Sequence, residues 1–96
     1  MAMIQITANE LEEKKYQLQK LNDELKQEIE ELNRISLSLK HDWEGEAADA
    51  YQDNSRKQVK KLMDAVHGVQ RYIKALDRII IEYKTTESRN VCIAKH

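Results

Sequence analysis

The chain has 96 residues, of which 34% are charged, and it contains no proline, no phenylalanine and only two glycines. Its formal net charge of −1 at pH 7 gives no electrostatic reason to expect nucleic acid as a partner. A sheet protein would need turn residues at regular intervals, but proline is absent and glycine nearly so, which leaves little to interrupt a helix. The composition therefore predicts a single all-α domain.

The first predicted helix spans residues 7–40. Thr7 is followed three residues later by Glu10, which is the spacing of a capping box at the start of a helix. Leucine then recurs every seven residues, the spacing that places side chains on one face of a coiled-coil helix. These leucines are Leu11, Leu18, Leu25, Leu32 and Leu39.

The second predicted helix spans residues 46–87 and repeats this pattern. Two apolar series with seven-residue spacing interleave at steps of three and four, so they form one stripe. The members are Val59, Val66, Ile73 and Ile80 in one series and Leu62, Val69, Leu76 and Tyr83 in the other. We expect residues 88–96, which follow this stripe, to form a flexible tail.

The stretch Trp43-Glu44-Gly45 lies between the two predicted helices and contains the only tryptophan. Glycine permits a chain reversal because it has no Cβ, and the indole ring offers apolar surface to close the end of a hairpin. Folding residues 7–40 back onto residues 46–87 buries apolar surface of both helices. We therefore predict an antiparallel helical hairpin with its turn at residues 43–45.

Two further predictions concern packing. Each helix keeps apolar surface on a second face, so two hairpins are expected to pair into a four-helix bundle. In the hairpin, an acidic run would lie near a basic run, although such exposed ion pairs stabilise by only ~0–1 kcal/mol each. The runs are Glu24, Glu28, Glu30 and Glu31 on the first helix and Arg56, Lys57, Lys60 and Lys61 on the second.

The sequence offers little for catalysis or for metal binding. No two histidines stand at ligand spacing, and Cys92 with His96 would supply two ligands where a structural zinc site needs four. A single cysteine excludes an internal disulfide, and no glycine-rich phosphate-binding loop is present. We therefore expect no enzyme, no catalytic or metal-binding residue, no cofactor and no small-molecule substrate.

Trp43-Glu44-Gly45, set between two heptad helices in a chain of this length, resembles the WXG family. These are the small, early-secreted-antigen-like substrates of type VII secretion systems. The resemblance extends to about Glu87 and includes Tyr83 with Glu87, which fit the Tyr-x-x-x-Asp/Glu export signal of the family. Residues four apart lie on one side of a helix, so the phenol and the carboxylate would form one patch.

The resemblance also implies how the protein is exported. Family members leave the cell as folded dimers through a membrane-embedded ATPase, and the N-terminal residues here do not resemble a Sec signal peptide. Tyr83 and Glu87 of one chain would lie near Trp43 and Gly45 of its partner, forming a composite signal. The implied partner is a second copy, a related WXG-like protein or the N-terminal region of a toxin. The protein would be cytoplasmic before export and extracellular afterwards.

Two other functions stay open on the sequence. In the first, the chain is a small partner that escorts a toxin to the same secretion system. Alternatively, it is a cytoplasmic helical adaptor or chaperone in which Trp43 only closes the turn. In that case Tyr83 is the last core residue of its stripe and Glu87 is a solvated charge.

Overall fold

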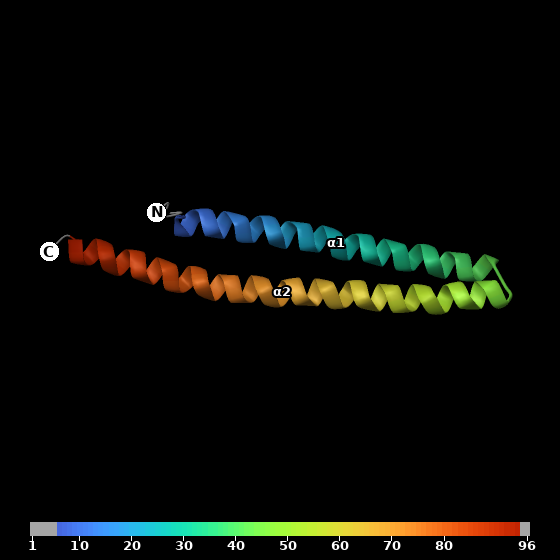
Figure 1. Ribbon diagram of the computed structural model, residues 1–96. Coiled ribbons are helices and arrows are strands. Elements are labelled where there is room, and N and C mark those ends of the chain that lie inside the picture. Colours follow the sequence, from blue (N-terminus) through green and yellow to red (C-terminus); the bar gives the residue numbers. More distant parts are fainter. Residues whose placement is uncertain (1–5, 95–96) are drawn as a thin grey trace, which may run out of the picture.

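The computed structural model describes residues 6–94, with only the backbone for residues 88–94, and consists of two long helices (Figure 1). Helix α1 spans Ala8–Asp42 and helix α2 spans Glu46–Ala94. The two helices run antiparallel as a hairpin that measures 77 × 24 × 20 Å. The predicted all-α hairpin is confirmed.

Helix α1 begins with the predicted cap. Thr7 has extended backbone angles, its Oγ1 accepts a hydrogen bond from Glu10 N at 3.1 Å, and its carbonyl accepts one from Leu11 N at 3.0 Å. The side-chain bond satisfies an amide that has no partner within the helix. The helix then continues to Asp42, two residues beyond the predicted end, because no helix-breaking residue intervenes.

Helix α2 ends later than predicted. We expected a flexible tail over residues 88–96, but the backbone is helical to Ala94, while residues 95 and 96 lie outside the described part of the chain. Residues 88–94 contain neither glycine nor proline, so nothing in this segment interrupts the helix. As a result, α2 projects past the start of α1 at the end where both termini lie (Figure 1).

Polar residues occupy much of the seam between α1 and α2. Asn22 Nδ2 donates to the carbonyl of Val66 at 3.2 Å, and Ser36 Oγ lies 2.9 Å from Ser55 Oγ. Gln52 Nε2 donates to the carbonyl of Ser36 at 2.8 Å. Such contacts set the register of the hairpin because each pairs one particular residue with another. The buried residues of α1 share one line at multiples of seven: Ala8, Asn22, Ile29 and Ser36.

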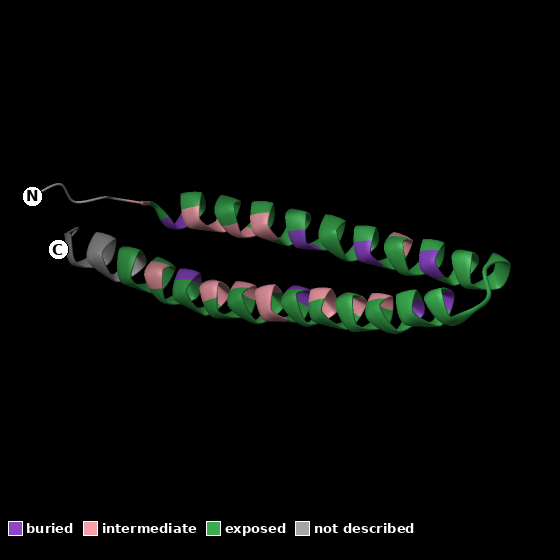
Figure 2. Cartoon of the chain, turned by 45° about the vertical axis from the view of Figure 1, so that its right-hand side comes forward, coloured by how far each residue is buried: buried purple, intermediate pink, exposed green. Residues whose placement is uncertain are grey.

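The apolar residues of the predicted stripes differ in burial (Figure 2). Two of them, Val66 and Ile80, are buried in α2. The half-buried ones are Leu11, Leu18, Val59, Leu62, Val69, Ile73 and Leu76. By contrast, Leu25, Leu32 and Leu39 are 39%, 40% and 38% exposed. These three leucines lie beside the seam because each is three residues past one of its buried positions.

The predicted pairing of the acidic and basic runs is not found. Among the described residues, no ion pair joins residues 24–31 to residues 56–61, and most of these charges lie on outward faces. The helices are instead joined nearer the open end of the hairpin. Lys15 Nζ donates to Asp77 Oδ1 at 2.8 Å, and Lys84 Nζ donates to Glu12 Oε2 at 2.9 Å.

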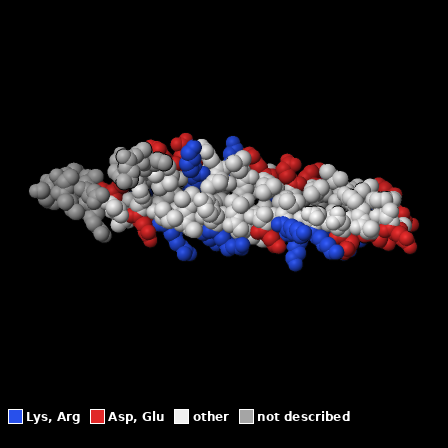
Figure 3. Space-filling model, viewed as in Figure 1, with Lys and Arg blue, Asp and Glu red and all other residues white. Residues whose placement is uncertain are grey.

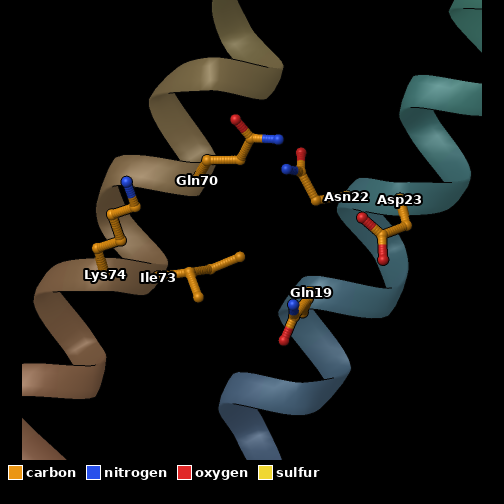
Figure 4. Close-up of a pocket in the computed structure, with 6 residues that line it drawn as sticks. All are labelled: Gln19, Asn22, Asp23, Gln70, Ile73 and Lys74. Carbon is orange, nitrogen blue, oxygen red and sulfur yellow. The ribbon is translucent and has the colours of Figure 1, made fainter.

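We predict that Asn22→Leu stabilises the protein. Asn22 is 5% exposed and its Oδ1 has no hydrogen-bond partner among the described residues. An unsatisfied buried acceptor costs about 1–3 kcal/mol, and an apolar side chain of similar size removes that penalty while losing about 0.5–1.5 kcal/mol from the bond to the Val66 carbonyl. The thermal unfolding midpoint should rise by about 4–8 °C for each kcal/mol gained. Figure 4 shows Asn22 beside an open hollow lined by Gln19, Asp23, Gln70, Ile73 and Lys74.

Thermal unfolding followed by circular dichroism, at one protein concentration, checks this prediction. Asn33→Leu is the matched control, since Asn33 is exposed on the same helix and should shift the midpoint little. A midpoint lowered by Asn22→Leu would contradict the prediction and show that Asn22 is stabilising in the assembled protein.

Candidate functional site

The turn brings Trp43, Gly45 and Tyr51 together. Trp43 ends α1 in an extended conformation, and Gly45 has φ 118°, a region that side chains with a Cβ rarely adopt. The carbonyl of Gly45 accepts a hydrogen bond from Asp49 N at 3.0 Å, so Gly45 caps α2. The predicted role of this glycine in the chain reversal agrees with its positive φ.

An aromatic pair covers the turn. The ring centroids of Trp43 and Tyr51 are 5.8 Å apart and the ring planes meet at 50°, a tilted arrangement favoured by aromatic quadrupoles. Each side chain is still 38% exposed. The pair therefore packs across the end of the hairpin and still leaves aromatic surface exposed. Our sequence prediction did not include Tyr51 in the site, because pairing across a turn depends on its geometry.

An apolar face runs along one side of the hairpin. On α1 it consists of the exposed leucines with Leu21 and Ile35, which lie three or four residues from them. On α2 it consists of exposed residues at multiples of seven, which share one line. We define the apolar face by these residues: Leu21, Leu25, Leu32, Ile35, Leu39, Tyr51, Tyr72 and Ile79.

The contributions of α1 and α2 to the apolar face lie on the same side. Leu18, Leu21 and Leu25 of α1 line one open hollow together with Val69 of α2. Figure 3 shows an uncharged band along the hairpin, with acidic and basic side chains gathered at its margins. Exposed apolar surface of this extent is typical of an interaction site rather than of a monomer.

Tyr83 and Glu87 lie at the open end of the hairpin. Tyr83 is half-buried and its hydroxyl donates to the carbonyl of Ile6, which lies just ahead of α1. Glu87 is exposed, one helical turn further along α2. Beside them, the hydrogen bond and the charge of Lys84 hold the pKa of Glu12 below its ordinary value. At this end, α2 is therefore joined to Ile6 by a hydrogen bond and to α1 by an ion pair.

The four predicted recognition residues form two separate groups. Trp43 and Gly45 lie at the turn, whereas Tyr83 and Glu87 lie at the opposite end of the hairpin (Figure 1). At 1.5 Å per residue, the stretch of α2 between the groups is about 55 Å long. A signal that joins both groups at one place therefore requires a second chain.

The described residues contain neither a metal-binding cluster nor a membrane-spanning helix. No group of three or more His, Cys, Asp or Glu side chains in the described part of the chain could hold a metal ion. The side chains of Cys92 and His96 lie outside it. Neither helix, over its described length, is long and apolar enough to cross a membrane.

A comparison with protein families places these features in context. Residues 3–88 match the family WXG100, described as "Proteins of 100 residues with WXG". The matched range contains the turn, the apolar face and both residues of the Tyr83 and Glu87 pair. Comparisons with curated proteins and with solved structures gave no match. Because the family match covers most of its length, the chain belongs to the WXG100 family.

Proposed function

We propose that the protein is a secreted substrate of a type VII secretion system and that it leaves the cell as a folded dimer. The observation that carries this proposal is the family match over residues 3–88, because proteins of the WXG family are type VII substrates. On this proposal the chain is cytoplasmic before export and extracellular afterwards.

The partner is a second copy of the chain. The apolar face is a wide strip on one side of an elongated hairpin, and a second identical strip covers it along its whole length. Two such hairpins form a four-helix bundle that buries the exposed leucines and tyrosines of both copies. The interior of the hairpin alone is small, since its buried apolar residues are Ala8, Ile29, Ala48, Val66 and Ile80.

Antiparallel pairing of the two hairpins assembles the export signal. The turn of one copy then lies beside the open end of the other, so Trp43 of one chain approaches Tyr83 and Glu87 of its partner. A twofold axis creates the same arrangement at both ends of the dimer. The secretion ATPase reads this composite surface, which only the folded dimer displays.

The experiment that tests the function is the partition of the wild-type protein between culture supernatant and cytosol. It is measured in the native host and in an isogenic strain whose secretion ATPase cannot hydrolyse ATP, with a cytosolic enzyme as the lysis control. We expect the protein in the supernatant only when the ATPase is active. Retention in the cytosol, while another substrate of the system is exported, would favour the cytoplasmic adaptor instead.

Native mass spectrometry of the protein purified from the host tests the partner. Two copies of the 11.3 kDa chain are expected in one complex. A complex with a different chain would contradict the homodimer and favour an escort that carries a toxin or a related WXG-like protein.

A further inference from the structure

The recognition element at residues 83–87 lies where α2 loses the support of α1. Helix α1 starts at Ala8, and the contact partner of Tyr83 is Ile6, ahead of that start. Beyond this level α2 continues to Ala94 and projects past α1 (Figure 1). Helix ends without tertiary support fray readily. Fraying that starts at Ala94 would therefore reach this element once residues 88–94 have opened.

Two contacts join this element to α1 and to Ile6, which precedes α1. Tyr83 donates its hydroxyl to the Ile6 carbonyl, and Lys84 Nζ lies 2.9 Å from Glu12 Oε2. The first contact is half-buried and uses a backbone acceptor, so it holds the residue ahead of α1 against α2. The second lies one residue further along α2 and adds a charge-assisted bond.

The two threonines of the element face their own helix instead. Thr85 Oγ1 donates to the carbonyl of Ile81 at 2.9 Å, and Thr86 Oγ1 donates to the carbonyl of Glu82 at 3.0 Å. These bonds are local to α2 and give no support from α1. Among residues 83–87, the hydrogen bonds and the ion pair with the first part of the chain thus come from Tyr83 and Lys84.

We propose that the start of α1 is part of the export signal, because Ile6 and Glu12 hold residues 83–87 helical and keep Tyr83 and Glu87 on one patch. This inference rests on the proposed function and extends it to residues outside the Tyr-x-x-x-Glu element. Since the Tyr83 hydroxyl is already bonded within the chain, the ATPase contacts the exposed part of its ring together with Glu87. Glu12 and Ile6 are positioning residues in this arrangement.

Charge reversal across the Glu12 and Lys84 pair tests the inference. Glu12→Lys and Lys84→Glu each replace an attraction with a repulsion, and the double variant restores an ion pair of opposite polarity. Glu13→Lys is the matched control, since Glu13 is exposed next to Glu12 and has the same charge. Two quantities are measured on each full-length variant: amide hydrogen exchange at residues 83–87 in the purified dimer, and the exported fraction.

Both single reversals should speed exchange at residues 83–87 by about fivefold and reduce export by a similar factor. The double variant should recover both quantities, and Glu13→Lys should change neither. Unchanged exchange in the single variants would overturn the inference even in a host that exports nothing, so its failure is distinct from failure of the proposed function. Faster exchange with undiminished export would also overturn it, because the ATPase would then be indifferent to helical order at residues 83–87.

Discussion

Leu32→Glu is expected to separate the paired hairpins into poorly folded single chains. Leu32 lies in the middle of the apolar face, and the proposed dimer contains two copies of it. The hairpin leaves 40% of Leu32 exposed, so covering that surface contributes about 0.6–1.2 kcal/mol per copy. Losing both leucines therefore weakens the dimer by about 1–2 kcal/mol, which is about five- to thirtyfold in dissociation constant, and the desolvation of two buried carboxylates adds to this loss.

The loss of pairing should also reduce helix content. With its apolar face uncovered, the hairpin is held mainly by a seam that contains Asn22, Ser36 and Gln52, and the stability gained from such polar contacts is modest. Sedimentation velocity and far-ultraviolet circular dichroism at equal concentrations measure the two effects together. Leu37→Glu is the control, because Leu37 is 56% exposed on the same helix but points away from the apolar face. Equal behaviour of the two variants would contradict the assignment of the interface.

Trp43→Ala and Tyr83→Ala are each expected to reduce export at least tenfold while the dimer persists. Each variant removes one half of the proposed composite signal at both ends of the proposed dimer. Trp43 is 38% exposed, and beyond the apolar area that it buries its pairing with Tyr51 contributes about 0.5–1.5 kcal/mol to stability. The loss of export should therefore far exceed the loss of folding.

The measurement compares the exported fraction with the size and the unfolding midpoint of each purified variant. Tyr16→Ala is the control, since Tyr16 is 58% exposed and lies outside the apolar face. Tyr83→Phe separates the ring from the hydroxyl: it keeps the ring surface but loses the bond to Ile6. Export of Trp43→Ala at the wild-type level would show that the turn is not part of the export signal.

Local patterns in the sequence predicted the elements of the fold well. The Thr7 cap, the glycine reversal and the long helices all follow from residues close together in the chain, whose effects depend little on tertiary context. The end of α2 was misjudged because an apolar stripe ends near Glu87 whereas the backbone has no reason to leave the helix there.

The division between seam and apolar face was harder to predict. The leucine repeat marks an apolar line, yet the adjacent line with Asn22 and Ser36 faces α2, and hydrophobic periodicity gives such polar positions no weight. The tie between Tyr83 and Ile6 joins residues 77 positions apart. Contacts of this kind depend on the exact register of the hairpin. The sequence pattern predicts that register only to within one helical turn.

A mixed dimer tests most directly the claim that the signal is shared between two chains. When Trp43→Ala and Tyr83→Ala chains are coexpressed, neither end of either homodimer carries an intact signal. Random pairing makes about half of the dimers mixed, and one end of each mixed dimer combines an intact Trp43 with an intact Tyr83 of the partner chain. We predict that both variants then reach the supernatant together, although neither is exported alone. Retention of both chains, with the mixed dimer demonstrated in the cytosol, would contradict a signal assembled between two hairpins.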